Sequence, residues 1–273
     1  MHKTEHGAPR LEEMFAVADR AADEAGAILL ERFGKAKVDY KGQFDLVTDA
    51  DRAAEQRIVE ILRDAFPGHG IVGEESGEQP GESRVRWLVD PIDGTTNYAH
   101  GLPLFAVSIA AEVDGELAVG IVYNPVYQEK YTAIRGHGAF LNGRRLAVSD
   151  TAELEKSMLM TGFPYPVRSS EESNIDHFIN FSNRCRAVRR LGSAALDLAY
   201  VARGALDGYW DLYLHPWDLA AGWLLVEEAG GKVTDLRGRP LTYGVRQILA
   251  TNGKIHDEML RVLALGKTGL DTP

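Results

Sequence analysis

The chain has 273 residues, of which 45% are hydrophobic and 26% are charged, a composition typical of an ordinary globular protein rather than a disordered or fibrous one. The formal charge of −10 argues against non-specific binding to nucleic acid, which depends on clustered lysine and arginine. The one cysteine, Cys185, excludes an intramolecular disulfide and a thiolate metal cluster. We expect a cytoplasmic protein, because the start of the chain does not resemble a signal peptide and no run of about 18 apolar residues predicts a membrane span.

The first half of the chain, 1–150, is predicted to combine two long helices with antiparallel strands. Apolar residues recur at helical spacing over 11–34, and Gly34 is a suitable stop. A second helix begins near Thr48, where the sequence Thr-Asp-Ala-Asp is typical of an N-terminal cap. Over 104–146, apolar runs separated by short turns predict a hairpin that continues into further strands.

Strands and helices alternate in the second half, 151–273, which is typical of a sheet with helices packed on it. A linker rich in proline or serine does not separate the halves, so we expect them to form one rigid unit. The predicted strands are 156–164, 186–190, 207–213, 231–236 and 246–252, and the predicted helices are 171–183, 192–204, 217–229 and 254–264.

The segment 87–101, WLVDPIDGTTNYAHG, places two acids at the end of an apolar strand. The residue before a proline favours an extended backbone, so we expect the strand to stop at Asp90 and Asp93 to lie in the turn that follows. A partly buried carboxylate needs a partner, and the segment contains no lysine or arginine. The partner must therefore come from elsewhere.

A short helix is predicted directly after these acids. Gly94 permits a left-handed backbone, and Thr95 or Thr96 is expected to cap a helix that runs through Tyr98. A helix N-terminus carries free N–H groups and the positive end of the helix dipole, so it attracts phosphate. The segment thus combines anions with an anion-binding helix end, and a cation is needed between them.

Other acids also follow the ends of apolar elements. Glu74 follows a strand that ends at Gly73, Asp218 begins a helix after Trp217, and Asp51 lies near the start of the second helix. If these acids converge they repel one another, by about 4 kcal/mol for two charges ~4 Å apart in a partly buried setting. Ligands made of oxygen select hard cations, so Mg²⁺ is predicted with Mn²⁺ as the alternative, and zinc is disfavoured because no Cys or His cluster accompanies the acids.

Each of these signals is weak by itself. A single acid at a strand end is most often a solvated turn residue, and Thr48 with Asp51 is more often a helix cap than part of a catalytic site. The set is informative because several acids lie beside a predicted phosphate-binding helix end. Carboxylates, divalent cations and phosphate-binding amides together indicate metal-assisted hydrolysis of a phosphate ester.

Two segments, WLVDPIDGTTNY and HPWDLAAG, with GEES upstream, resemble the inositol monophosphatase family. The resemblance covers nearly the whole chain. It implies a five-layered αβαβα sandwich and a lithium-sensitive, Mg²⁺-dependent phosphatase with two or three ions. It also implies hydrolysis by a metal-activated water without a covalent phospho-enzyme. Because the family is commonly dimeric, we expect a homodimer.

The resemblance assigns metal-binding roles to five positions. Glu74, Asp90 and the backbone carbonyl of Ile92 would hold a first Mg²⁺. Asp90, Asp93 and Asp218 would hold a second, and Glu74 is also implied for a third, weaker ion.

The same resemblance assigns catalytic roles. Glu74 and Thr95, the latter paired with Asp51, would position and activate the attacking water. Lys41 is implied near the metals, with a plain surface lysine as the alternative. The amides of Gly94 and Thr95 would hold the phosphate.

The leaving alcohol is implied to meet residues of the second half. Asp211 falls where the family places an acid that binds substrate hydroxyls, and Arg190 matches an arginine that is structural or at the dimer interface. His215, close to Asp218, is more often a packed or surface histidine than part of a site. The implied substrate-binding residues are Asp93, Gly94, Thr95, Gly192, Ser193, Ala194, Asp211 and Asp218.

Several substrates and one different function stay open. The same metal site in related families serves inositol phosphates, fructose 1,6-bisphosphate, histidinol phosphate and 3′-phosphoadenosine 5′-phosphate. Asp211 suits a polyol or the ammonium group of histidinol phosphate, and a bisphosphate would need a basic pocket, for which 184–190 is the candidate. Some bacterial relatives act as partners in ribosomal RNA transcription, although the charge of −10 argues against direct contact with RNA.

Overall fold

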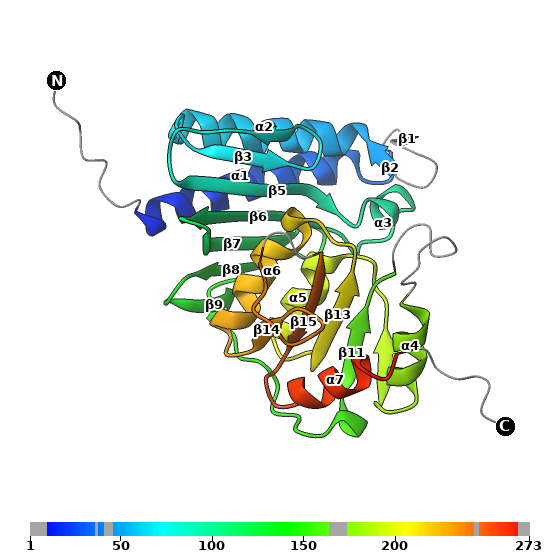
Figure 1. The fold of residues 1–273 in the computed structure, drawn as a ribbon. Coiled ribbons are helices and arrows are strands. Elements are labelled where there is room, and N and C mark those ends of the chain that lie inside the picture. The colour runs from blue at the N-terminus through cyan, green and yellow to red at the C-terminus, as the bar shows by residue number, and fades with distance from the viewer. Residues whose placement is uncertain (1–9, 36–37, 41–45, 164–173, 243–245, 267–273) are drawn as a thin grey trace.

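The computed structural model describes residues 10–35, 38–40, 46–163, 174–242 and 246–266. Their elements stack in five layers, in the order helices, sheet, helices, sheet and helices (Figure 1). The predicted αβαβα sandwich is therefore confirmed. Among the described residues, no helix is both long and apolar enough to cross a membrane.

The first layer contains helices α1 (Leu11–Arg32) and α2 (Asp49–Ala65), which pack on each other and on the first sheet. Small residues let α1 lie close to that sheet: a Cβ added at Gly26 would come within 2.5 Å of the Tyr123 ring. The predicted cap of α2 is confirmed, because the Thr48 side chain accepts from the amide of Asp51 and the Asp51 side chain accepts from the amide of Thr48. α1 ends at Arg32, two residues before the predicted stop.

The first sheet has eight strands and is antiparallel except where β3 pairs with β5 in parallel. The predicted antiparallel meander is thus confirmed from β5 onward, and the parallel pair was not predicted. In spatial order the strands are β10 (Arg144–Arg145), β9 (Gly138–Leu141), β8 (Glu129–Ile134), β7 (Glu116–Asn124), β6 (Ala106–Val113), β5 (Val85–Asp93), β3 (Gly70–Gly73) and β4 (Gly77–Gln79).

Helices α5 (Ala194–Ala202) and α6 (Pro216–Glu228) form the middle layer. α6 packs against β5, β6, β7 and β8 on one side and against β14 and β15 on the other. The contact with the first sheet is close, because a Cβ added at Gly120 of β7 would lie 3.0 Å from the backbone oxygen of Ala221. The two halves of the chain therefore share one apolar core through α6.

The second sheet has five strands, with α4 (Ile175–Ser182) and α7 (His256–Leu263) on its outer side. β11 runs parallel to both β12 and β13, whereas β15 is antiparallel to β13 and β14. The predicted helix 171–183 begins in residues outside the described part of the chain. In spatial order the strands are β12 (Ala187–Arg189), β11 (Met158–Thr161), β13 (Gly208–Leu212), β15 (Gln247–Thr251) and β14 (Lys232–Thr234), and the smaller elements elsewhere are β1 (Val38–Tyr40), β2 (Leu46–Thr48), α3 (Thr95–Ala99) and η1 (Leu154–Lys156).

A neutral histidine is buried where α7 meets the second sheet. The His256 side chain is fully buried, with Nδ1 2.9 Å from Thr251 Oγ1 and Nε2 3.0 Å from Thr234 Oγ1. Burial lowers the pKa of His256 from 6.5 to about 4, because a charged imidazole in the core would lose its hydration.

This burial predicts how stability depends on pH. Between pH 6.5 and about 4, His256 is protonated in the unfolded chain but stays neutral in the native protein. The contribution of the neutral His256 to the free energy of unfolding is therefore present above pH 6.5 and is lost as the pH falls through about 4. In His256→Gln, the free energy of unfolding measured with urea should fall less steeply over this range than in the wild type. His100→Gln, which removes an exposed histidine, should keep the wild-type slope. Equal slopes in all three proteins would contradict a depressed pKa at His256.

Candidate active site

The four acids predicted as metal ligands lie at the ends of three elements. Glu74 follows β3, Asp90 and Asp93 lie near the end of β5, and Asp218 lies in the first turn of α6. They are near enough to act on one another, because Glu74, Asp93 and Asp218 all raise the pKa of Asp90. The structure therefore brings acids from both halves of the chain into one region.

Strand β5 continues past the proline, which corrects the predicted stop at Asp90. The strand ends at Asp93, which pairs with Ala106 of β6, and the pairing register shifts between Asp90 and Asp93. Pro91 has no N–H for the ladder, so an irregularity at this point is expected. Pairing with β6 outweighs the local interruption, and the prediction that Asp93 lies in a turn was wrong.

Asp90 is the most buried of these four acids. Its side chain is 2% exposed, and Oδ1 accepts the Ile92 amide at 2.9 Å. Burial raises the pKa of Asp90 well above its ordinary value, and the neighbouring carboxylates of Glu74, Asp93 and Asp218 raise it further. A buried carboxylate among others resists ionisation, and a bound cation would reverse that preference.

Asp93 is held by the N-terminus of α5. Its Oδ2 accepts from the Ser193 hydroxyl and, at 2.7 Å, from the Ala195 amide. Burial raises the pKa of Asp93 to about 6, although the hydrogen bonds from Ser193 and Ala195 lower it. Ser193 is also the N-cap of α5, so the predicted substrate residue Ser193 lies directly beside the predicted metal ligand Asp93.

Gly94 fixes the entry to α3. Its φ is +97°, and an added Cβ would lie 2.9 Å from the Leu104 oxygen and 3.2 Å from the Gly192 oxygen. Gly94 is the N-cap, and α3 begins at Thr95 without a side-chain cap. The left-handed backbone predicted for Gly94 is confirmed, and the predicted cap by Thr95 or Thr96 was wrong because glycine alone suits the crowded cap position.

Thr95 lies between the metal-ligand segment and α2. Its Oγ1 is 3.0 Å from the Ile92 oxygen and 3.3 Å from Asp51 Oδ1. The other oxygen of Asp51 accepts from the Thr48 amide at 2.7 Å and the Thr48 hydroxyl at 2.6 Å. The hydrogen bonds that cap α2 therefore also fix the carboxylate that faces Thr95. Asp51 can thus cap the helix and take part in a catalytic site at the same time.

Asp211 lies on β13, near the same acids. Its side chain accepts from the Tyr209 hydroxyl at 2.7 Å and from the Leu212 amide at 2.6 Å. Burial raises the pKa of Asp211 to about 6. The two hydrogen bonds and the charge of Arg190 lower this pKa, whereas the charge of Asp93 raises it. Arg190 thus lies close enough to affect the predicted substrate acid.

Three functional candidates were missed by sequence reasoning. Asn97 donates at 2.7 Å to both the Leu104 and Leu191 oxygens, which ties α3 to the segment containing Gly192. Asp197 is 1% exposed, and its Oδ1 has no hydrogen-bond partner among the described residues. Glu55 is buried on α2. The available signals were the i, i+4 spacing of Asp51 and Glu55 on an apolar helix face and a single acid in the apolar run AALDLAYVA.

Of the remaining candidates from the sequence, one lies outside the described residues and the others lie within them. Lys41 lies outside the described residues. His215 is exposed and its ring stacks on Trp217 with centroids 4.7 Å apart, and its backbone amide donates to Asp218 Oδ2 at 2.7 Å. Arg184, which follows α4, donates to the Asn180 oxygen at 2.9 Å. His215 therefore touches the site through its backbone.

The cluster fits a hard divalent cation in donor type and in charge. The implied ligands are carboxylates and one carbonyl oxygen, which magnesium prefers, and the raised pKa of Asp218, caused by burial and then by Asp93, shows the same repulsion as at Asp90. Within the described residues, no three His, Cys, Asp or Glu side chains already form a metal-binding cage. Asp90, Asp93 and Asp218 each accept a hydrogen bond from a backbone amide.

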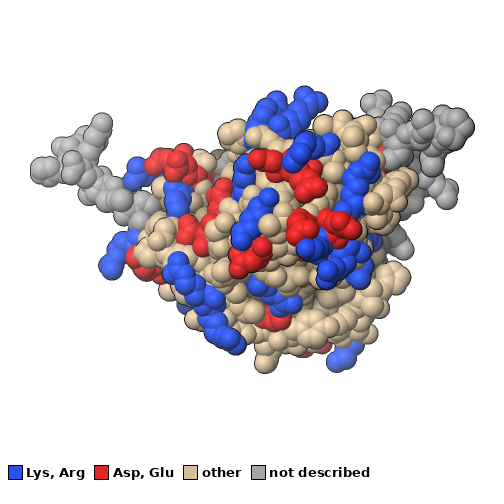
Figure 2. All heavy atoms as spheres, turned by 90° about the horizontal axis from the view of Figure 1, so that it is seen from below, with Lys and Arg blue, Asp and Glu red and all other residues tan. Residues whose placement is uncertain are grey.

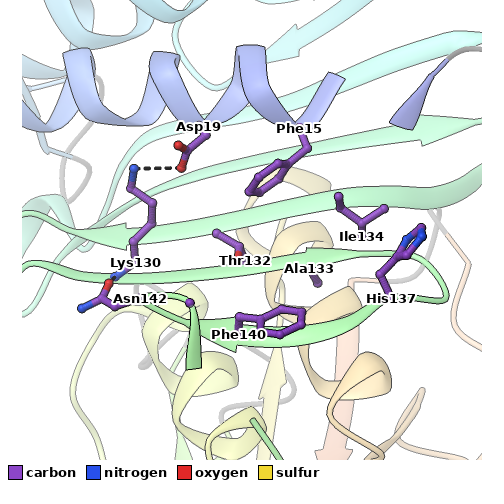
Figure 3. A pocket seen from close by; sticks show the side chains of 10 residues that line it. Phe15, Asp19, Lys130, Thr132, Ala133, Ile134, His137, Phe140 and Asn142 are labelled. Carbon is purple, nitrogen blue, oxygen red and sulfur yellow. Dashed lines mark hydrogen bonds and ion pairs between the residues drawn. The ribbon is translucent and has the colours of Figure 1, made fainter. Parts of the chain in front are cut away.

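A separate pocket lies between α1 and the strands β8 and β9 (Figure 3). Its volume is about 550 Å³. Phe15 and Phe140 face it from opposite sides, the ion pair of Lys130 with Asp19 at 2.8 Å lies at one end, and His137 lies at the other. The pocket contains none of the predicted site residues.

The layered αβαβα fold and its carboxylate cluster at strand ends suit a metal-dependent enzyme, and comparison with known sequences identifies the family. The sequence matches the inositol monophosphatase family over residues 10–265. The chain belongs to this family. Membership supports a phosphatase that binds phosphorylated substrates, and metal dependence is general in the family.

Individual relatives carry two kinds of name. A Nus factor SuhB from Pseudomonas aeruginosa is 45% identical, with 93% of this chain and 96% of the relative covered. An inositol-1-monophosphatase from Synechocystis is 44% identical, with 93% and 90% covered. A solved inositol monophosphatase structure from Anabaena has a TM-score of 0.88 at 44% identity, with 95% of this chain and 98% of that chain covered.

The crowding around Gly94 predicts a graded loss of stability. Gly94→Ala and Gly115→Ala both place alanine at positive φ, +97° and +82°, which costs about 1–2 kcal/mol at each position. At Gly115 nothing lies within 4 Å of the added Cβ. Gly94→Ala should therefore lower the free energy of unfolding, measured with urea, by about 1–3 kcal/mol more than Gly115→Ala. Equal losses would show that the backbone around α3 is not fixed.

Proposed function

We propose that the chain is a Mg²⁺-dependent phosphomonoester hydrolase that converts myo-inositol 1-phosphate and water to myo-inositol and phosphate. The observation that carries the proposal is Asp90, which is 2% exposed while Glu74, Asp93 and Asp218 raise its pKa. Such a cluster favours bound cations, and its oxygen donors favour magnesium. The substrate class is supported by relatives named inositol-1-monophosphatase at 44% and 45% identity.

The metal-binding residues follow from the acid cluster and the family pattern. Glu74, Asp90 and the Ile92 carbonyl would hold one Mg²⁺, and Asp90, Asp93 and Asp218 would hold a second, with Glu74 also serving a weaker third. When bound, the ions supply a more acidic water and neutralise charge on the phosphate and the leaving oxygen. Because Ser193 and Ala195 both bind Oδ2 of Asp93, the orientation of this carboxylate is set before any ion arrives.

Thr95 and Asp51 are proposed to orient the attacking water together with Glu74. Thr48 holds one Asp51 oxygen through two hydrogen bonds, which leaves Oδ1 facing the Thr95 hydroxyl at 3.3 Å. When the Thr95 hydroxyl donates a hydrogen bond to Asp51, its oxygen can accept a hydrogen bond from the water, which orients a lone pair of the water toward phosphorus. Direct attack by this water would form the new phosphorus–oxygen bond as the bond to the alcohol oxygen breaks, with a proton from the water ending on the alcohol, so the proposed reaction has no covalent phospho-enzyme.

The attacking water and the leaving alcohol are proposed to lie on opposite sides of the phosphorus atom, as an in-line displacement requires. The backbone amides of Gly94 and Thr95 would hold the phosphate, in line with the anion preference of helix N-termini. Asp211 would accept hydrogen bonds from substrate hydroxyls, since with a pKa of about 6 it is ionised at neutral pH. The other residues proposed to line the substrate are Asp93, Gly192, Ser193, Ala194 and Asp218.

A role as a Nus factor is the second candidate, because relatives of that name are 43–45% identical. The charge of the chain argues against a Nus-factor role that depends on direct contact with RNA. The formal charge is −10, and the face seen from below mixes lysine and arginine with acids rather than gathering them into a basic patch (Figure 2). A protein partner would fit this candidate better, and we expect the chain itself to form a homodimer in the cytoplasm.

Phosphate release tests the proposed reaction. We expect Mg²⁺-dependent release that is faster from myo-inositol 1-phosphate than from histidinol phosphate, fructose 1,6-bisphosphate or 3′-phosphoadenosine 5′-phosphate, and inhibition by lithium. Preference for another of these compounds would keep the metal site and overturn the substrate. Absence of release from all four would favour the Nus-factor candidate.

Asp93→Asn separates a metal-binding role from a structural one. We expect phosphatase activity to fall by at least about 100-fold, because a metal ion contributes several kcal/mol to the reaction. Without metal, the midpoint of thermal unfolding should stay equal to that of the wild type or rise, since one of the mutually repelling charges is gone. Asp64→Asn, on an exposed part of α2, should change neither quantity. A variant that unfolds would show that Asp93 is structural.

A further inference from the structure

Glu55 is a buried acid whose partners are backbone amides. It lies on α2, one turn after Asp51, and its side chain is 2% exposed. Oε2 accepts the Glu75 amide at 2.8 Å, and Oε1 accepts the Ser76 amide at 2.7 Å. Both oxygens are thus used to hold the turn that directly follows Glu74.

The strand before this turn also lies against Glu55. A Cβ added at Gly73 would come within 2.7 Å of the carboxyl carbon and Oε1 of Glu55. The amide of Glu74 itself donates to the Val89 oxygen of β5 at 3.1 Å. Glu74 is therefore fixed from both sides, by β5 before it and by the Glu55 carboxylate after it.

The turn of α2 that contains Asp51 and Glu55 also contacts Thr95. Asp51 faces the Thr95 hydroxyl, and residues four apart on a helix project on the same side. Asp51 and Glu55 thus connect the two groups proposed to activate the water, Thr95 and Glu74, to one rigid element. A shift in the β3–β4 turn would move Glu74 relative to Asp90, whose pKa it affects.

We propose that Glu55 is a positioning residue that fixes Glu74 for metal binding and thereby sets the affinity of the site for its divalent cation. The inference rests on the proposed function in taking Glu74 as a metal ligand. Hydrogen-bonded groups behind a metal ligand orient that ligand, and losing one weakens metal binding by about 10- to 100-fold.

Glu55→Gln tests the inference in the full chain without relying on turnover. The amide group would turn an N–H₂ toward one of the two backbone donors and lose that hydrogen bond. We expect the dissociation constant for Mn²⁺, followed by the electron paramagnetic resonance signal of free Mn²⁺, to rise by about tenfold or more. Hydrogen exchange at the amides of Glu75 and Ser76 should become faster in the same variant.

Two further variants make the test specific. Glu60→Gln on the same helix removes an exposed acid that pairs with Arg57, and it should leave Mn²⁺ affinity and exchange at the turn unchanged. Glu55→Asp keeps the charge, but its side chain is too short to hold both amides, so it should also weaken Mn²⁺ binding. This variant serves as the test if Glu55→Gln does not fold.

The outcomes separate this inference from the proposed function. Unchanged Mn²⁺ affinity in both Glu55 variants, or unchanged exchange at the turn, would overturn the positioning role. A wild-type protein that binds Mn²⁺ but releases no phosphate would refute the proposed hydrolase, while the shift in affinity on substitution of Glu55 would still establish the inference.

Discussion

The repulsion among Glu74, Asp90, Asp93 and Asp218 is the constraint on which the rest of this structure depends. Asp90 is buried, and three other acids raise its pKa. Carboxylates in such a position need compensation. The described contacts provide part of it through amides and hydroxyls, as at Asp93 and Asp218, and divalent cations are proposed to provide the rest.

The layered fold makes this arrangement rigid. β5 carries two of the acids, and its position in the first sheet is set by β3 on one side and β6 on the other. α6 carries Asp218 and packs on that sheet as well as on the second one. Because α6 joins both halves of the chain through one core, the acids cannot separate without disrupting that core.

Much of the fold could be predicted from the sequence, and so could the proximity of the four acids, whereas the roles of the site residues stay predictions. Apolar spacing predicted the long helices, and the position of acids after apolar runs predicted the cluster. The errors arose where long-range contacts outweigh local preference. Pairing of Asp93 with Ala106 extended β5 past its proline, and crowding by Leu104 and Gly192 made Gly94 the cap of α3.

Glu55 and Asp197 were missed for a different reason, because the signals that mark them in the sequence are ambiguous. A single acid in an amphipathic or apolar helix has the same pattern whether it faces solvent or a neighbouring turn. Only packing distinguishes the two, as for Glu55, whose partners are 20 and 21 residues away along the chain. The role of Lys41 stays a prediction, because this residue lies outside the described part of the chain.

The central claim is that the acid cluster binds divalent cations. The most direct measurement is an anomalous difference map from crystals of the protein soaked in Mn²⁺. The account predicts strong peaks in contact with the Asp90 carboxylate, one shared with Glu74 and one with Asp93 and Asp218. A map without a peak among these four acids at saturating Mn²⁺ would contradict it.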